Sequence, residues 1–216
     1  MTGRDALELI SAVYPHVFTE PYGARFINEV VSIMWHRYPW RQSLEDLPPF
    51  YLIDGQAEVY APLVNIPTDF HGLHEVWLQH YGGDTEPIEI TANLNKYNVY
   101  GKPEVICYLP EKSGFRLWPV PSGYNPPYWW VAGTYKKKPT EITNENLASQ
   151  GLPFDDIYAH VIRQGLLWKF KQEIIQSPEA DSELTKFLIM LRDMAATEGL
   201  VAGPVVIHPE EDLRYG

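Results

Sequence analysis

The feature of this sequence that most constrains its fold is the order of its segments. Two stretches with helical periodicity come first, a long segment rich in proline and aromatic residues follows, and two more helical stretches lie after it. Helices segregated from strands are typical of an α+β domain. We therefore expect an antiparallel four-helix core made of two N-terminal and two C-terminal helices, with a central proline-rich antiparallel β insert and an extended C-terminal tail. The corresponding segments are 1–44, 45–150, 151–199 and 200–216.

Capping residues and apolar periodicity place the four helices. Thr2 and Asp5 can form a reciprocal cap for the first helix, and the second is expected over 19–38. The third begins near Pro153, and its apolar arc is too wide for one neighbour, which predicts a central position in the bundle. The fourth is expected to end at Gly199 in a left-handed cap.

Six short strands are expected in the insert, because residues of high β propensity lie there between turn residues. The predicted ranges are 58–64, 72–80, 87–90, 104–109, 115–120 and 128–135. The fourth and fifth are joined by a short turn with proline and glycine, which is the strongest hairpin signal. Prolines elsewhere favour edge or bulged strands, so we expect a small irregular sheet or barrel.

Charge and cysteine content narrow the functional classes. A net charge of −11 disfavours nonspecific nucleic-acid binding, because phosphates are bound mainly through lysine and arginine. The basic run Lys136-Lys137-Lys138 is expected to be a solvated strand end. The single cysteine, Cys107, excludes an internal disulfide, fits a reducing compartment and is expected in the core. No membrane partner is expected, and the acidic Asp5 and Glu8 disfavour a signal peptide.

Candidate catalytic residues are sparse, and we expect neither an enzyme nor a bound cofactor or metal. The sequence has no dinucleotide or phosphate-binding glycine motif and no nucleophile elbow. His71, His74, His80 and Glu75 have the chemistry of zinc ligands, but His71 and His74 would point to opposite faces of a strand. Asp155-Asp156 falls in the first turn of a helix, where acidic side chains are favourable.

Aromatic side chains of the insert support two alternative functions. The candidates are Trp118, Tyr124, Trp129 and Trp130, with Tyr128 beside them. They could form a subunit or tail interface, or they could present a glycan-stacking platform in a carbohydrate-binding module. Since adjacent strand residues face opposite sides, Trp129 and Trp130 cannot share one platform. A hydrolase using Glu75 and Asp69 is a third alternative, although no defined spacing pairs these carboxylates.

A series of short motifs follows in order along residues 5–198. They are A-L-E-L-I-S-A-V at the start, W-H-R-Y-P-W at 35–40, I-P-T-D-F at 66–70, Y-N-V-Y-G-K-P at 97–103, F-R-L-W-P-V-P at 115–121, G-T-Y at 133–135 and G-L-P-F-D-D at 151–156. In this order they resemble the head-to-tail adaptor proteins of short-tailed phages, also called tail tubular protein A or head completion proteins.

The resemblance implies a structural protein of the virion neck or tail, assembled in the host cytoplasm as a ring of twelve copies below the portal. The helices and C-terminal tail would bind the portal protein, and the strand region would receive a tail or nozzle protein. The acidic balance fits a conduit, since DNA in transit would not be held by phosphate contacts. The apolar tail residues expected at the portal are Val201, Val205, Val206, Ile207, Leu213 and Tyr215.

Overall fold

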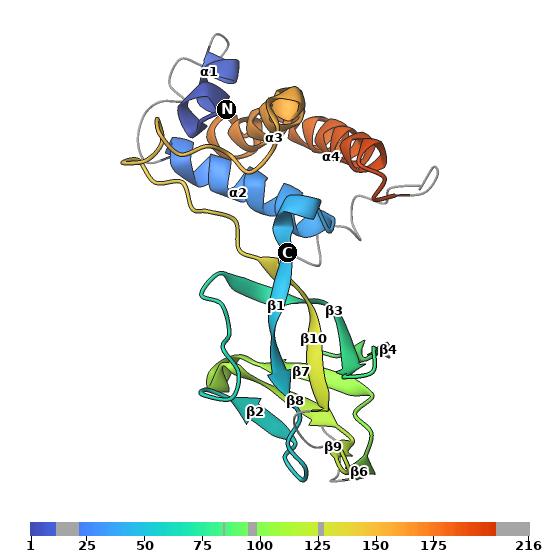
Figure 1. Ribbon diagram of the computed structural model, residues 1–216. Coiled ribbons are helices and arrows are strands. Elements are labelled where there is room, and N and C mark those ends of the chain that lie inside the picture. The colour runs from blue at the N-terminus through green and yellow to red at the C-terminus, as the bar shows by residue number, and fades with distance from the viewer. Residues whose placement is uncertain (12–21, 84, 95–98, 125–127, 202–216) are drawn as a thin grey trace. The chain divides into compact units, whose positions relative to one another are not determined.

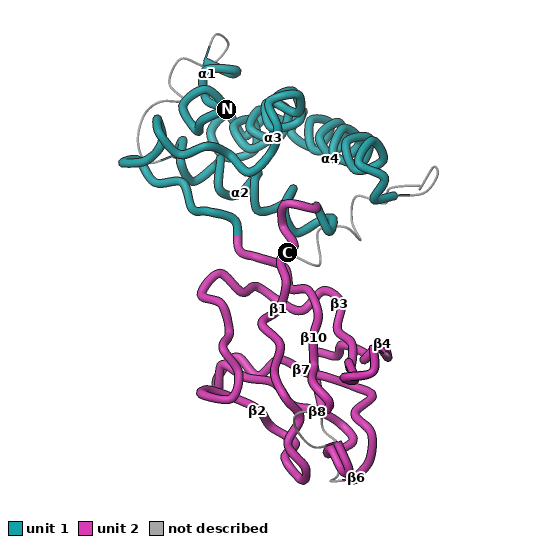
Figure 2. The backbone as a smooth tube through the Cα atoms, in the orientation of Figure 1, with its two compact units in different colours: residues 1–40, 139–216 teal, residues 41–138 magenta. Residues whose placement is uncertain are grey.

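The chain folds into two compact units. The computed structural model describes residues 1–11, 22–83, 85–94, 99–124 and 128–201. One unit consists of Met1–Trp40 with Pro139–Gly216, and the other is Arg41–Lys138 (Figure 2). The first is helical and the second is built from strands, and each has its own cluster of buried apolar side chains.

The helical unit takes elements from both ends of the chain (Figure 1). Its elements are α1 (Gly3–Ser11), α2 (Tyr22–Arg37), the short 3-10 turn η4 (Asp156–Tyr158), α3 (Ala159–Phe170), the π-helical turn η5 (Lys171–Ile175) and α4 (Ala180–Thr197). Helix α3 packs against α1, α2 and α4, which confirms its predicted central position. At Gly165 the helices approach so closely that a Cβ atom would lie 2.6 Å from Val30 Cγ1 and 2.9 Å from Phe187 Cε2.

Two predicted helix caps are confirmed by the hydrogen bonds. The Thr2 amide donates to Asp5 Oδ2 at 2.7 Å, and the Asp5 amide donates to Thr2 Oγ1 at 3.2 Å, which is the reciprocal capping box. At the other end, Gly199 has a φ of +72°, and the Leu200 amide donates to the carbonyl of Ala195 at 2.9 Å. Glycine suits this position because it has no Cβ to clash in the left-handed region.

The strand unit contains two four-stranded sheets and a two-stranded ribbon. The first sheet has the order β1 (Leu44–Tyr51), β10 (Trp129–Lys137), β3 (Phe70–His80) and β4 (Thr85–Pro87). The second has the order β2 (Glu58–Tyr60), β8 (Gly114–Trp118), β7 (Val105–Leu109) and β5 (Glu89–Ile90), and the ribbon pairs β6 (Tyr100–Gly101) with β9 (Val120–Pro121). The short 3-10 turns η2 (Arg41–Ser43) and η3 (Pro110–Lys112) complete the unit.

The two four-stranded sheets share one core. Their inner faces meet, for example, where the rings of Phe50 on β1 and Phe115 on β8 stack with centroids 5.4 Å apart. The predicted hairpin is confirmed, because β7 and β8 pair antiparallel around η3. Strand β1 was not among the predicted strands, since its Pro48-Pro49 pair hides the strand pattern and coincides with a register shift between Leu47 and Phe50.

The predicted fold class is wrong in its main feature. The described strand segment is not a small insert on an antiparallel four-helix core, since it holds ten strands and a core of its own. It is not purely antiparallel either, because β5 pairs parallel with β7 and β6 pairs parallel with β9. The physical reason is that alternating side chains such as Val76 and Leu78 bury enough apolar surface between the two sheets to need no helix.

None of the helices in the described parts of the chain is long and apolar enough to cross a membrane.

Candidate docking surface on the strand unit

The adjacent tryptophans of β10 lie on opposite faces of the first sheet, as strand alternation predicts. Trp129 packs partly against the strand-unit core, with its ring 4.5 Å from the ring of His80 and 5.1 Å from that of Tyr124. Trp130 contacts Tyr51, whose ring lies 6.4 Å away at an interplanar angle of 75°. The two tryptophans therefore belong to two different surroundings.

Trp118 occupies a third place. It belongs to β8, where Phe115 and Leu117 are buried in the core, so alternation turns Trp118 toward the outer face of the second sheet. A single glycan platform made from Trp118, Trp129 and Trp130 is therefore not formed.

A groove of about 630 Å³ lies beside β1 and β10. We call its lining residues the aromatic groove: Pro49, Phe50, Tyr51, Tyr81, Tyr128 and Trp130. The exposed fractions of its tyrosines are large, at 53% for Tyr51, 80% for Tyr81 and 58% for Tyr128. Aromatic side chains that gather on a surface in this way are typical of protein interaction sites.

Strand pairing brings the aromatic groove together. Tyr51 on β1 lies opposite Trp130 on β10, and Trp130 in turn lies opposite Gln79 on β3. Just beyond the strand ends, the Tyr81 amide donates to the carbonyl of Tyr128 at 3.0 Å. Residues far apart in the sequence thus meet because β10 pairs with β1 along one edge and with β3 along the other.

The aromatic groove is uncharged, although the whole chain has a net charge of −11. Among the described residues, none of those that line it is Asp, Glu, Lys, Arg or His. The indole N–H of Trp130 donates to Oε1 of Gln79 at 3.2 Å. The other side-chain polar groups of the lining are phenol hydroxyls, so the surface offers flat rings with a few neutral hydrogen-bonding groups.

The sequence identifies Trp130 as an interface candidate but does not identify Tyr51 or Tyr81. The strand that contains Tyr51 is hidden by its two prolines, and Tyr81 follows a strand end, where no periodicity identifies it.

The histidines proposed as alternative metal ligands all lie on β3. Among the described residues, no three His, Cys, Asp or Glu side chains gather in a group that could hold a metal ion. The ring of His80 lies against Trp129, whereas His74 and Glu75 border a second groove of about 580 Å³. The other residues that line this second groove are Val76, Trp77, Thr85, Pro87, Ile88 and Ile90.

The remaining catalytic candidates are held in structural contacts. Cys107 is buried, as expected, and burial raises the pKa of its thiol. Asp69 accepts a hydrogen bond from the Tyr135 hydroxyl at 2.9 Å. Burial of the phenol, together with this hydrogen bond, raises the pKa of Tyr135.

The adjacent acids before α3 also have structural partners. Oδ1 of Asp155 accepts a hydrogen bond from the Ile157 amide at 3.1 Å and caps η4, in line with the predicted role at a helix start. Asp156 forms an ion pair with the ammonium group of Met1. The hydrogen bond within this pair raises the pKa of the N-terminal amine.

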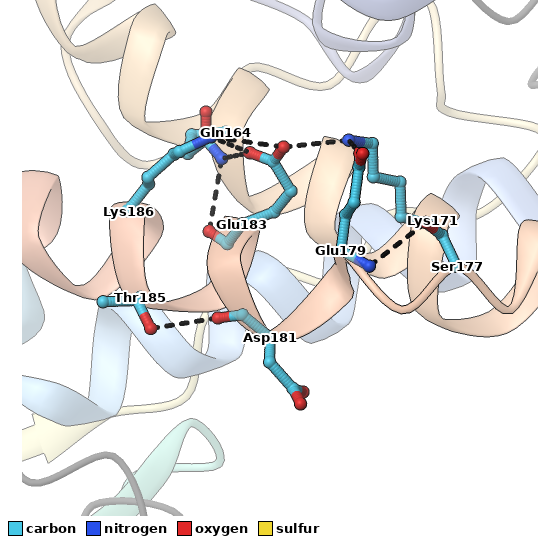
Figure 3. A network of polar contacts seen from close by, with 8 residues as sticks. All are labelled: Gln164, Lys171, Ser177, Glu179, Asp181, Glu183, Thr185 and Lys186. Atoms are coloured by element: carbon cyan, nitrogen blue, oxygen red, sulfur yellow. Dashed lines mark hydrogen bonds and ion pairs between the residues drawn. The ribbon is translucent and has the colours of Figure 1, made fainter.

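A network of polar contacts joins α3 to α4 in the helical unit (Figure 3). Glu183 is only 6% exposed, and its carboxylate lies among the side chains of three other residues. Lys171 Nζ lies 2.9 Å from Oε1, Gln164 Nε2 donates to Oε2 at 2.7 Å, and Lys186 Nζ lies 3.3 Å from Oε2. Lys171 also contacts Oε2 of Glu179 at 2.8 Å.

The network stabilises the charged forms of its members. The hydrogen bond from Lys171 is the main reason that the pKa of Glu183 falls to about 2, despite the opposing effect of burial. Hydrogen bonds to Glu179 and Glu183 raise the pKa of Lys171. These charges compensate one another inside the helical unit, so the network serves the fold.

The C-terminal tail is described only at its beginning. Val201 is half-buried and packs against the helical core, so part of its side chain is already covered within the chain. The other residues expected at the portal lie outside the described residues: Val205, Val206, Ile207, Leu213 and Tyr215.

The described residues thus form two units with separate cores and a groove lined by aromatic side chains. Residues 4–207 match the family model described as SU10 adaptor protein. Because the match covers most of the 216 residues, the chain belongs to the SU10 adaptor protein family and is a phage adaptor protein. No curated protein matches the chain.

Family membership confirms the coarser expectations and corrects one name. The chain is a structural component of a virion, its family favours a role other than catalysis, and an adaptor implies contact with portal and tail components in general. The matching family is that of the SU10 adaptor, however, and the narrower name of tail tubular protein A or head completion protein is not supported.

Proposed function

We propose that the chain is a head-to-tail adaptor that forms a ring of twelve copies below the portal, docks a tail component and surrounds part of the DNA path. The observation that supports this most is the division into a helical and a strand unit, each with its own core. An adaptor has to hold two different neighbours, and a chain with two separately stabilised units can give one surface to each.

The helical unit and the C-terminal tail are the proposed portal-binding side. The tail residues assigned to this contact are Val205, Val206, Ile207, Leu213 and Tyr215, with Val201 as the anchor at the end of the helical core. An extended segment loses conformational freedom when it binds, at a cost of about 1–2 kcal/mol per residue, so it requires a preformed groove or sheet edge on its partner.

The strand unit is the proposed side for the tail or nozzle protein. Of the aromatic residues assigned to a subunit or tail interface, Trp130 lines the aromatic groove, whereas Trp118, Tyr124 and Trp129 do not. Trp130 and the exposed tyrosines are therefore the proposed contact with the tail component, and the other three are assigned to contacts between subunits of the ring.

The charge balance supports a conduit in the virion neck. The chain has 28 acidic residues against 17 lysines and arginines. An acidic wall does not bind the phosphate backbone, so DNA would pass without sequence-specific contacts. No membrane takes part in this function.

The test compares two variants for attachment to portal-bearing capsids. Deleting residues 202–216 spares Val201 and the helical core, so the helical circular dichroism should be unchanged while cosedimentation with the capsids is lost. The matched control is Tyr81→Ala, which alters the strand unit and should still cosediment. Normal docking by the truncated chain would refute the proposed portal contact.

The oligomeric state is tested separately. We expect the isolated chain to remain monomeric at micromolar concentration and to form the ring only on the portal. Light scattering of the isolated protein measures this directly, and a stable large oligomer in the absence of portal would contradict it.

A further inference from the structure

We propose that the aromatic groove binds an extended, uncharged, proline-containing segment of the tail component. The inference rests on the proposed function and names the chemistry of the partner on the strand side. It is based on the residues that line the groove, on their lack of charge and on the sheet edge beside them.

The lining matches the shape and chemistry of such a segment. Aromatic rings from Tyr51, Tyr81, Tyr128 and Trp130, together with Pro49, form the groove. Proline-containing segments adopt an extended helix whose rings pack flat on aromatic side chains and whose carbonyls lack internal hydrogen bonds. Phenol hydroxyls at the groove can donate to such carbonyls, since each is a donor as well as an acceptor.

The absence of charge selects among partner segments. Among the described lining residues, a basic segment would meet no carboxylate and an acidic one would meet no lysine or arginine. A charged side chain buried against them would lose its water without gaining a partner. The rest of the chain is strongly acidic, with a net charge of −11. An uncharged segment is therefore the complementary occupant of this surface.

The sheet edge is poorly suited to the commonest alternative for an extended peptide, which is to add a strand to the sheet. β1 is the edge strand of its sheet, and an added strand would need its free amide groups. Pro48 and Pro49 have no N–H, and the register is shifted at this point. Near the groove this favours recognition by side chains, which is how aromatic grooves bind proline-containing segments.

A glycan fits the groove less well. Sugar rings stack on aromatic faces, but their many hydroxyls need polar partners in the floor of a site. The indole N–H of Trp130 is already donated to Gln79, and Phe50 turns its ring into the core. The side-chain hydrogen-bonding groups that remain on the described lining residues are phenol hydroxyls, which suit the sparse carbonyls of an extended peptide better.

The experiment titrates the full-length protein into a fluorescently labelled ten-residue proline peptide with blocked ends and follows the anisotropy. A glycine-serine peptide of equal length is the ligand control. Saturable binding of the proline peptide alone is expected. Tyr81→Ala and Tyr128→Ala should each weaken it by roughly threefold to tenfold, the effect of losing one aromatic contact. Tyr100→Ala removes a tyrosine that is 62% exposed but lies outside the groove lining, and it should bind like the wild type.

Several results would overturn the inference. They are no saturable binding at millimolar concentration, equal binding of both peptides, an equal loss in Tyr100→Ala, or displacement of the peptide by an unlabelled cello-oligosaccharide. Self-association that is abolished by Tyr81→Ala would assign the groove to a second copy instead.

The capsid assay separates this inference from the proposed function. If the wild type attaches to portal-bearing capsids but ignores the peptide, only the groove assignment fails. If it binds the peptide but never attaches, the proposed function fails, and the assignment of a tail partner fails with it.

Discussion

Replacing Glu183 by glutamine tests the idea that a buried carboxylate holds α3 to α4. The side chain keeps its size but loses its charge among Lys171, Gln164 and Lys186. The pKa of Glu183 is lowered from 4.5 to about 2. A difference of this size between folded and unfolded states corresponds to a contribution on the order of 3 kcal/mol to the free energy of unfolding.

The sign of the pH dependence follows from the lowered pKa. The folded state prefers the charged carboxylate, so the contribution is fully present above pH 4.5 and is lost as the pH falls toward 2. Glu183→Gln should therefore be clearly less stable than the wild type at pH 7. The difference in the free energy of unfolding between the two proteins should narrow steadily as the pH is lowered from about 5 to about 2.

The assay is urea unfolding at several pH values, followed by circular dichroism at a helical wavelength. This signal reports mainly the helical unit, which matters because a chain with two units need not unfold in one step. Glu179→Gln is the matched control. It removes another carboxylate from the same lysine, but its side chain is 70% exposed, so a smaller loss is expected. The reasoning would be refuted if both variants lost the same free energy of unfolding, or if the difference between Glu183→Gln and the wild type did not depend on pH.

Three further outcomes are expected. Gly165→Ala should lower the stability of the helical unit in urea unfolding, because crowding against Val30 and Phe187 costs about 1–3 kcal/mol and outweighs the gain of about 1 kcal/mol in helix propensity; a more stable variant would contradict this packing. Asp155→Ala should cost about 1 kcal/mol in the same assay through the lost cap before α3, and no change would argue against the cap. Cys107 should react with a thiol reagent at neutral pH only after unfolding, since burial raises its pKa, and fast labelling of the native protein would show that it is accessible.

Much of the local structure of the helical unit can be predicted from the sequence. The capping box at Thr2 and the left-handed cap at Gly199 are predictable because each depends on residues within one turn. The central position of α3 is predictable from the width of its apolar arc. In the strand unit, the hairpin of β7 and β8 is predictable for the same reason as the caps, because a short turn specifies which two strands pair.

The candidate site is predictable only in part. Strand alternation alone predicts that Trp129 and Trp130 lie on opposite faces, and the contacts of the two rings confirm it. The partners of Trp130 are beyond sequence reasoning. Tyr51 lies beside Trp130 because β1 pairs with β10, and Tyr81 lies at the groove because it follows the end of β3, which pairs with the other edge of β10. Neither strand pairing has a local signal in the sequence.

Local periodicity thus determined where helices and several strands form, which residues cap them and which side of a strand each aromatic occupies. The tertiary structure alone decided that the strands build a core of their own, and that a groove lined by aromatic side chains forms on that unit. The physical reason is the distance along the sequence between the residues that must come into contact. A cap or a hairpin depends on contacts a few residues apart, whereas the pairing of β1 with β10 joins residues more than seventy positions apart and is settled only when the whole sheet assembles.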